Sequence, residues 1–257
     1  MHVLQRVEES IAPFFFSLHD LDYLLILVAA EALGLPLVPP YLGLSEKERQ
    51  EIRTGINYGS GSAGILPETG TILGPNLSLD TQLKLFTETV QKYLSNTFKG
   101  PNELSDHFSK SIFYINIGSN DFIYTYLNEP DLSNPRYKPT VLSNDLTERL
   151  SQNLQALYML GARKFVVANL GLIGCIPYIV NRRKPKGVCV EELNQFVEVY
   201  NSKLIELLKG QSSTLPGSTF VTLKSYELST LMASEESMTQ GPVVLMLAMD
   251  PCHAPPT

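Results

Sequence analysis

The sequence predicts an α/β protein with a mostly parallel sheet, formed as a single domain over residues 1–257. Strand-like and helical patterns alternate along the chain, which is the order typical of parallel strands joined by helical crossovers. The two strongest strand patterns, residues 112–117 and 164–170, are each followed by glycine and polar residues. Ligands of open α/β sheets bind at the carboxyl ends of the strands, so we expect functional residues directly after these two segments.

The first half of the chain contains one clear amphipathic helix. Over residues 78–94 apolar side chains recur at helical spacing, and Ser78 stands where an N-cap is expected. Before this helix, residues 12–18 could form a short strand, and residues 21–33 have the pattern of a mostly buried helix. The proline-rich residues 35–41 are expected to form a loop.

The second half alternates more regularly between strands and helices. Strands are predicted at residues 112–117, 164–170 and 219–223, with a last one at residues 243–248. The first three are separated by two helical patterns, each followed by a glycine as a C-terminal signal. The helical positions are Leu146, Leu150, Leu154 and Leu157, closed by Gly161, and Leu193, Phe196, Val197, Tyr200, Leu204 and Leu207, closed by Gly210.

Charge and composition exclude several classes of function. The chain has 20 Lys and Arg against 26 Asp and Glu, a net charge of −6, so it shows no electrostatic footprint for nucleic acid. Its most apolar run, residues 24–30, is too short to span a membrane, and residues 1–9 lack the pattern of a signal peptide. No cluster of histidines and cysteines has metal-ligand spacing, so no metal site is predicted.

Three segments could carry chemistry. After the strand at residues 112–117, the side-chain amide of Asn120 could donate a hydrogen bond to an oxyanion formed during acyl transfer, although Gly118-Ser119-Asn120-Asp121 also suits a simple turn. Residues 55–64 are rich in Gly and Ser. Their backbone N–H groups could converge on an anion, the alternative being a flexible loop. Finally, Asp250 precedes His253 by three residues and could orient it as a general base.

Taken together, these segments resemble the plant GDSL esterase/lipases, a branch of the SGNH hydrolases. The resemblance is strong over residues 31–223 and rests on several motifs that occur in the family's order. They are GLPLVPPYL (34–42), GINYGSGSAGILPETG (55–70), IFYINIGSND (112–121), GARKFVVANLGLIGCIP (161–177) and GVCVEELNQFVEVYNSKL (187–204).

The resemblance implies a three-layer α/β/α sandwich around a flavodoxin-like parallel sheet. It also implies cofactor-free hydrolysis of carboxylic esters, with a small-molecule ester or a lipid as substrate. The family uses a Ser nucleophile, a His base, an Asp that orients the His, and Gly and Asn as donors to the oxyanion. Matched residue by residue, Gly61 and Asn120 correspond to the oxyanion donors, and Asp250 and His253 to the orienting acid and the base.

The resemblance also implies features of an exported protein, since family members are usually secreted. Cys175 and Cys189 match a family cysteine pair, which favours a disulfide and leaves Cys252 over. Asn76-Leu77-Ser78 would then be a potential glycosylation site.

The sequence departs from the family at both ends, over residues 1–30 and 224–257. Gly-Asp-Ser-Leu, the family's first block, does not occur, so the nucleophile Ser is absent and the first strand is missing or replaced by residues 12–18. Ser17 in that segment has no prepared base. We therefore expect the chain by itself to be nearly inactive. It would be either a catalytically dead relative that binds an ester, a lipid or a protein partner, or an incomplete form of an active enzyme.

Overall fold

The computed structural model describes residues 34, 36, 38–127, 138–233 and 249–251. Within them, four strands form one sheet in the order β1-β2-β3-β4. These strands are β1 (Ile112–Ile115), β2 (Lys164–Ala168), β3 (Thr219–Leu223) and β4 (Met249–Pro251). The predictions at residues 12–18, 21–33 and 243–248 lie outside the described residues.

The first three strands are parallel, as the sequence predicts. The short strand β4 runs antiparallel to β3, with Asp250 opposite Thr222, so the described sheet is mostly parallel, as predicted. An edge strand can pair in this direction because an antiparallel connection needs no helical crossover.

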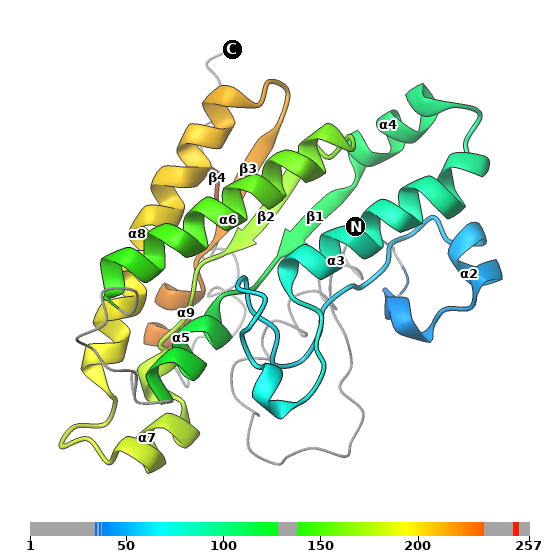
Figure 1. Cartoon of the computed structure of the whole chain (residues 1–257). Helices are drawn as coiled ribbons and strands as arrows, with labels where there is room; N and C mark the ends of the chain where they lie inside the picture. The colour runs from blue at the N-terminus through cyan, green and yellow to red at the C-terminus, as the bar shows by residue number, and fades with distance from the viewer. Residues whose placement is uncertain (1–33, 35, 37, 128–137, 234–248, 252–257) are drawn as a thin grey trace.

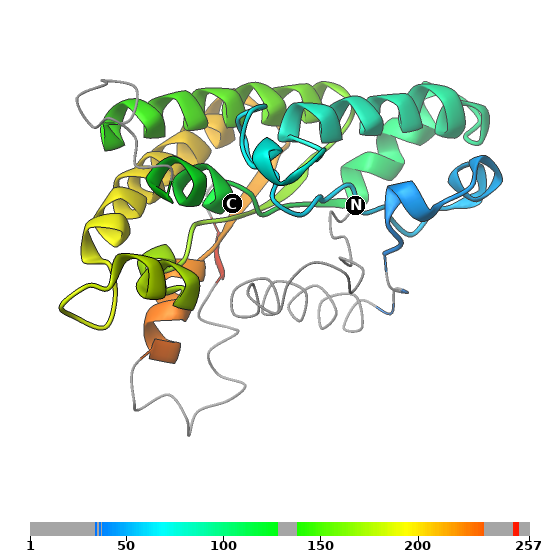
Figure 2. The same cartoon turned by 60° about the horizontal axis from the view of Figure 1, so that its bottom comes forward.

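Helices make up most of the remaining described chain, which confirms the α/β sandwich class (Figure 1). Figure 2 shows α3 and α6 along one face of the sheet, and α8 packs against α6 and β3. Among the described residues, none of the helices combines the length and the apolar character that crossing a bilayer requires. The helices are α2 (Glu46–Glu51), α3 (Leu79–Glu88), α4 (Pro101–Lys110), α5 (Ser119–Leu127), α6 (Pro139–Met159), α7 (Pro177–Arg183), α8 (Glu191–Thr214) and α9 (Ser225–Ala233), with short 3-10 turns at η1 (Tyr41–Gly43), η2 (Thr71–Leu73), η4 (Leu94–Asn96) and η6 (Ile173–Cys175).

A ladder of phenylalanines forms the centre of the core. Phe113, Phe165 and Phe220 occupy matched positions of the three parallel strands. The ring centroids of Phe113 and Phe165 are 5.9 Å apart and those of Phe165 and Phe220 4.6 Å, while Phe86 of α3 packs on Phe113 at 5.6 Å. These rings belong to the large cluster beneath the helices, so aromatic packing across the strands joins the sheet to its helical layer.

The predicted helix at residues 78–94 forms as α3 followed by a π-helical turn, η3 (Thr89–Tyr93), and by η4. Thr89 in this turn is fully buried. Its hydroxyl accepts a hydrogen bond from the Tyr58 hydroxyl (2.9 Å) and donates one to the Leu85 carbonyl oxygen (2.8 Å). Ser78 precedes the helix but does not cap it, because its hydroxyl contacts the Thr81 hydroxyl (3.1 Å) instead of a backbone N–H.

The two predicted helix-ending glycines behave differently. Gly161 has φ +112° and follows α6 closely, as expected. Gly210, in contrast, lies inside α8, which continues to Thr214. The buried face of this helix extends past the glycine to Gln211, so tertiary packing continues the helix through a residue of low helix propensity.

Candidate functional site

The turn from β1 into α5 sets the position of Asn120. Gly118 has φ +120°, a conformation strained for other residues, and a Cβ there would lie 3.3 Å from the Leu170 side chain. The backbone N–H of Asp121 donates to the Gly118 carbonyl oxygen (3.1 Å), so α5 begins immediately after the turn. Asn120 and Asp121 thus lie in the first turn of α5, beyond the carboxyl end of β1.

Asn120 binds the Gly/Ser-rich loop that contains Gly61. Its Nδ2 donates to the carbonyl oxygen of Ala63 at 2.8 Å. The side-chain amide has two N–H groups, so this bond orients the amide while using one of them. Asn120 is half-buried and Gly61, two residues before Ala63, is exposed. The structure therefore joins the two segments from which the resemblance drew its oxyanion donors.

The carboxylate of Asp121 binds the same loop at three further points. Its Oδ2 accepts the backbone N–H of Ile65 at 2.8 Å, and its Oδ1 accepts the N–H of Leu66 at 3.0 Å and the hydroxyl of Thr69 at 2.6 Å. The side chain is completely buried. Burial raises the pKa of Asp121 to about 6, while the three hydrogen bonds act to lower it. The ionised form of this carboxylate can accept all three bonds.

Glycines allow the loop to approach this carboxylate closely. A Cβ on Gly64 would lie 2.5 Å from Oδ1 of Asp121 and 2.5 Å from Cγ2 of Thr69. Gly70, at φ +72°, faces Ser62 so closely that a Cβ would lie 2.0 Å from the Ser62 carbonyl oxygen. Ser62 itself has φ +62°, an uncommon conformation for a residue with a side chain. The contacts at both its ends therefore determine the course of the loop from Gly61 to Gly70.

Asn76 closes the loop from the other side. Its Nδ2 donates to the Thr69 carbonyl oxygen (2.9 Å) and to the Ser62 hydroxyl (3.3 Å), and Ser78 of the same sequon is buried. Both N–H groups of the amide are thus used inside the fold. The potential glycosylation site of the sequence is a structural contact in the folded chain.

The segment after β2, the second place where the sequence predicts functional residues, is bound to α8. Asn201 accepts the N–H of Leu170 (2.9 Å) and donates to the Leu170 carbonyl oxygen (2.8 Å). Asn194 accepts the N–H of Gly174 (2.8 Å), and a Cβ on Gly174 would lie 2.2 Å from the Val190 carbonyl oxygen. These contacts hold the segment against α8. A disulfide between Cys175 and Cys189, the pair that the resemblance implies, joins it to the residues before α8.

The structure describes only part of the candidate Asp–His pair. Asp250 lies in β4 opposite Thr222, near the carboxyl end of β3. Asn120 follows the carboxyl end of β1, three strands from β4 in the sheet, so the backbone of Asp250 lies about 14 Å from that end of β1. His253 falls outside the described residues. Within the described part of the chain, no three His, Cys, Asp or Glu side chains are placed to hold a metal ion.

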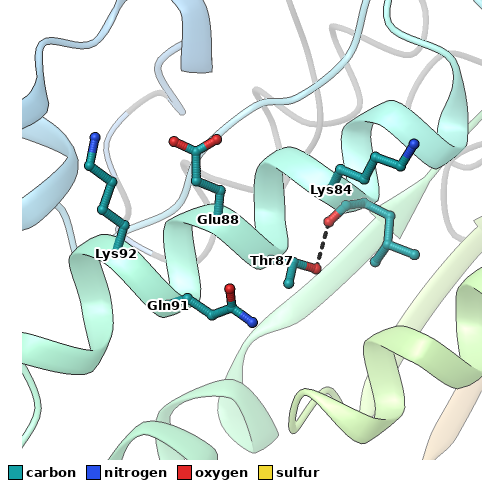
Figure 3. A pocket seen from close by; sticks show the side chains of 6 residues that line it. Lys84, Thr87, Glu88, Gln91 and Lys92 are labelled. Carbon is teal, nitrogen blue, oxygen red and sulfur yellow. Dashed lines mark hydrogen bonds between the residues drawn. The ribbon is translucent and has the colours of Figure 1, made fainter.

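Two hollows of the described surface lie on or beneath α3. A groove of about 450 Å³ follows the outer side of α3 and η3 (Figure 3), and its lining comes from this one helical segment. A smaller cavity of about 50 Å³, lined by residues of α3, β1 and α6, reaches Asn116 and Ile117 after β1. Neither is lined by Asn120 or Gly61, so the groove is not assigned to the site. The groove residues are Leu83, Lys84, Thr87, Glu88, Gln91 and Lys92.

Three residues of the site are not identified by sequence reasoning. Asp121 and Gly64 read as turn formers, and Thr69 carries no motif of its own. Their contacts join positions 52 to 57 residues apart, which a pattern within one segment cannot show. One local signal could have indicated Asp121: it is an acidic residue directly after the candidate oxyanion donor Asn120, just beyond a buried strand.

Comparisons with known proteins identify the family of the chain. Residues 20–239 match the model of the GDSL-like lipase/acylhydrolase family. The chain is 40% identical to GDSL esterase/lipase 7 of Arabidopsis thaliana over 203 residues, which cover 77% of this chain and 55% of that protein. It is 39% identical to GDSL esterase/lipase At1g33811 of the same plant over 200 residues, covering 74% and 52% of the two chains.

The chain therefore belongs to the GDSL-like lipase/acylhydrolase family. It spans about half the length of the curated relatives that it matches.

Proposed function

We propose that this chain supplies the oxyanion-binding part of a carboxylic ester hydrolase, with Asn120 and Gly61 as the hydrogen-bond donors. The observation that carries the proposal is the 2.8 Å bond from Asn120 Nδ2 to the Ala63 carbonyl oxygen. This bond fixes the amide beside the loop of Gly61, at the end of the sheet where α/β proteins bind ligands. The family membership supports ester or lipid substrates.

In the reaction, a serine Oγ attacks the acyl carbon of the ester and gives its proton to a histidine. The carbonyl electrons move to the oxygen, and Asn120 and Gly61 stabilise that oxyanion. When the oxyanion collapses, the alcohol leaves with the proton from the histidine. Water then repeats the cycle on the acyl-enzyme and releases the acid. Asp250 and His253 are our candidates for the orienting acid and the base.

We further propose that the 257 residues alone turn over esters very slowly. The sequence contains no Gly-Asp-Ser-Leu block. Without the nucleophile, an oxyanion hole retains on the order of a thousandth or less of the activity of a complete triad. The alternative function is binding of an ester, a lipid or a protein partner without turnover. The Cys175–Cys189 disulfide supports an oxidising, extracellular location.

Hydrolysis of p-nitrophenyl butyrate by the purified chain tests the proposal, with Asn120→Ala and His253→Ala beside the unchanged protein. Asn144→Ala is the matched control, because Asn144 is an exposed residue of α6. We expect background turnover and a folded α/β circular dichroism spectrum. We also expect that fusing the missing first block of a relative to the chain produces turnover that Asn120→Ala abolishes and Asn144→Ala preserves.

Two results would contradict the proposal. Strong turnover by the unchanged chain would reveal a nucleophile that the sequence reading overlooks. A folded fusion protein whose turnover is the same with Asn120 and with alanine would remove Asn120 from the oxyanion hole.

A further inference from the structure

We propose that Asp121 is a positioning residue for the oxyanion donors, because its carboxylate holds the loop of Gly61 in register with Asn120. The inference rests on the function proposed above and gives a task to a side chain that does not itself face substrate. Asn120 and Asp121 are consecutive, yet their side chains bind one loop at two neighbouring places. Asn120 binds Ala63, and Asp121 binds Ile65, Leu66 and Thr69.

The two sets of bonds differ in strength. Asn120 contributes one neutral hydrogen bond to the loop. Asp121 contributes three hydrogen bonds to a carboxylate, and bonds of this kind are roughly twice as strong as neutral ones. The loop therefore cannot move along α5 without breaking the stronger set.

Gly64 transfers this restraint to the oxyanion donors. It is the single residue between the carbonyl bound by Asn120 and the first N–H bound by Asp121. It lies against the carboxylate so closely that even a methyl group would collide with it. Displacement of Ile65 must therefore displace Ala63, and with it the amide of Asn120 and the backbone of Gly61.

The ionisation of Asp121 offers a direct way to observe this coupling. A protonated carboxyl group carries a donor at one oxygen, so it loses acceptor capacity toward the loop. Across from it, Tyr200 of α8 is a titratable side chain that interacts with the Asp121 charge. Burial and that charge both raise the pKa of Tyr200, so the phenol stays neutral while Asp121 titrates.

The test is a pH titration of the whole chain by nuclear magnetic resonance, with 15N in Asn, Ile and Leu. The reporters are the side-chain amide of Asn120 and the backbone N–H groups of Ile65 and Leu66. We expect all three to shift with one common midpoint, that of Asp121. Asp121→Asn should abolish the shift at Asn120. Asp106→Asn, which changes an exposed carboxylate of α4, should preserve it.

A pair of variants at Thr69 shows whether the response depends on the contact itself. Thr69→Val removes the hydroxyl whose hydrogen bond lowers the pKa of Asp121, so the midpoint at Asn120 should move to higher pH. Thr69→Ser keeps the hydroxyl and should restore the midpoint. If Asp121 contributed only to folding, the midpoint of the Asn120 shift would not depend on the Thr69 hydroxyl.

The proposal is overturned if the Asn120 amide does not shift with the Asp121 midpoint in the unchanged protein. It is also overturned if Thr69→Val and Thr69→Ser give the same midpoint. Both results can be obtained even if Asp121→Asn does not fold. Since no reporter depends on turnover, a negative hydrolysis assay contradicts the proposed function without affecting this result.

Discussion

The side-chain amide of Asn120 and the carbonyl oxygen of Ala63 are 2.8 Å apart, although 57 residues separate them in the chain. This bond joins the first turn of α5 to the loop of Gly61. The adjacent Asp121 carboxylate reinforces it from inside the protein. The candidate site thus consists of two segments that depend on each other, and the consequences can be measured one at a time.

Gly64→Ala should destabilise the fold and disturb the site. The added methyl group would lie 2.5 Å from the Asp121 carboxylate and from Thr69, both of which are buried. Overpacking of this kind costs about 1–3 kcal/mol of the free energy of unfolding, measurable by urea denaturation.

Gly210→Ala is the matched control for that substitution. Gly210 lies within α8, and apart from its chain neighbours and the adjacent helix backbone nothing is within 4 Å of the place where its Cβ would stand. Alanine should therefore stabilise the protein by about 0.5–1 kcal/mol. Equal effects of the two substitutions would contradict the close approach of Gly64 to Asp121.

Asp121 should make stability depend on pH in a defined direction. The pKa of this carboxyl is about 6 in the folded chain and 3.8 ordinarily, so between these values the folded state binds the proton more readily. Its contribution is therefore fully present below the ordinary pKa and is lost as the pH rises through the folded one. The difference between the two pKa values corresponds to about 3 kcal/mol.

Asp121→Asn isolates this dependence, since an amide does not titrate. We expect the free energy of unfolding of the unchanged protein, relative to the variant, to fall by up to about 3 kcal/mol between about pH 3.5 and about pH 7. Chemical denaturation of both proteins at several pH values measures it. A relative stability that rises over this range would show that the hydrogen bonds outweigh burial.

Removal of the disulfide should lower stability. Cys175 and Cys189 are 14 residues apart, and closing a loop of this size restricts the unfolded chain by about 3 kcal/mol. Cys175→Ser with Cys189→Ser should lower the free energy of unfolding by this amount. Dithiothreitol should lower the stability of the unchanged protein to the same level and leave the double variant unaffected. If dithiothreitol destabilised both proteins equally, the loss of stability would not come from the Cys175–Cys189 disulfide.

Asn201→Ala should destabilise the end of β2. The Asn201 side chain satisfies both the N–H and the carbonyl group of Leu170, and both residues are buried. Each buried backbone group left unpaired costs about 1–3 kcal/mol. Asn144→Ala on the exposed face of α6 is the control and should change stability by less than about 0.5 kcal/mol. Thermal unfolding followed by circular dichroism compares the two, and similar melting temperatures would contradict the role of Asn201.

The sequence by itself determined the local elements and the family. Short apolar runs predicted the strands containing Phe113, Phe165 and Phe220, and helical periodicity predicted the helices between them, because both patterns depend only on neighbouring residues. The motifs around Gly61 and Asn120 indicated the class of chemistry. Local signals also misled, since Ser78 does not cap α3 and Gly210 does not end α8.

Only the tertiary structure decided how those elements cooperate. The sequence alone indicated no role for Asp121 beyond a turn, and it indicated Asn76 as a potential glycosylation site. In the fold, both hold the loop of Gly61. The physical reason is that a buried polar group without a partner is costly, and the partner that Asp121 or Asn76 finds in space is not its neighbour in the chain. These hydrogen bonds form only when the sheet and its helices pack together, so no single segment of the sequence can predict them.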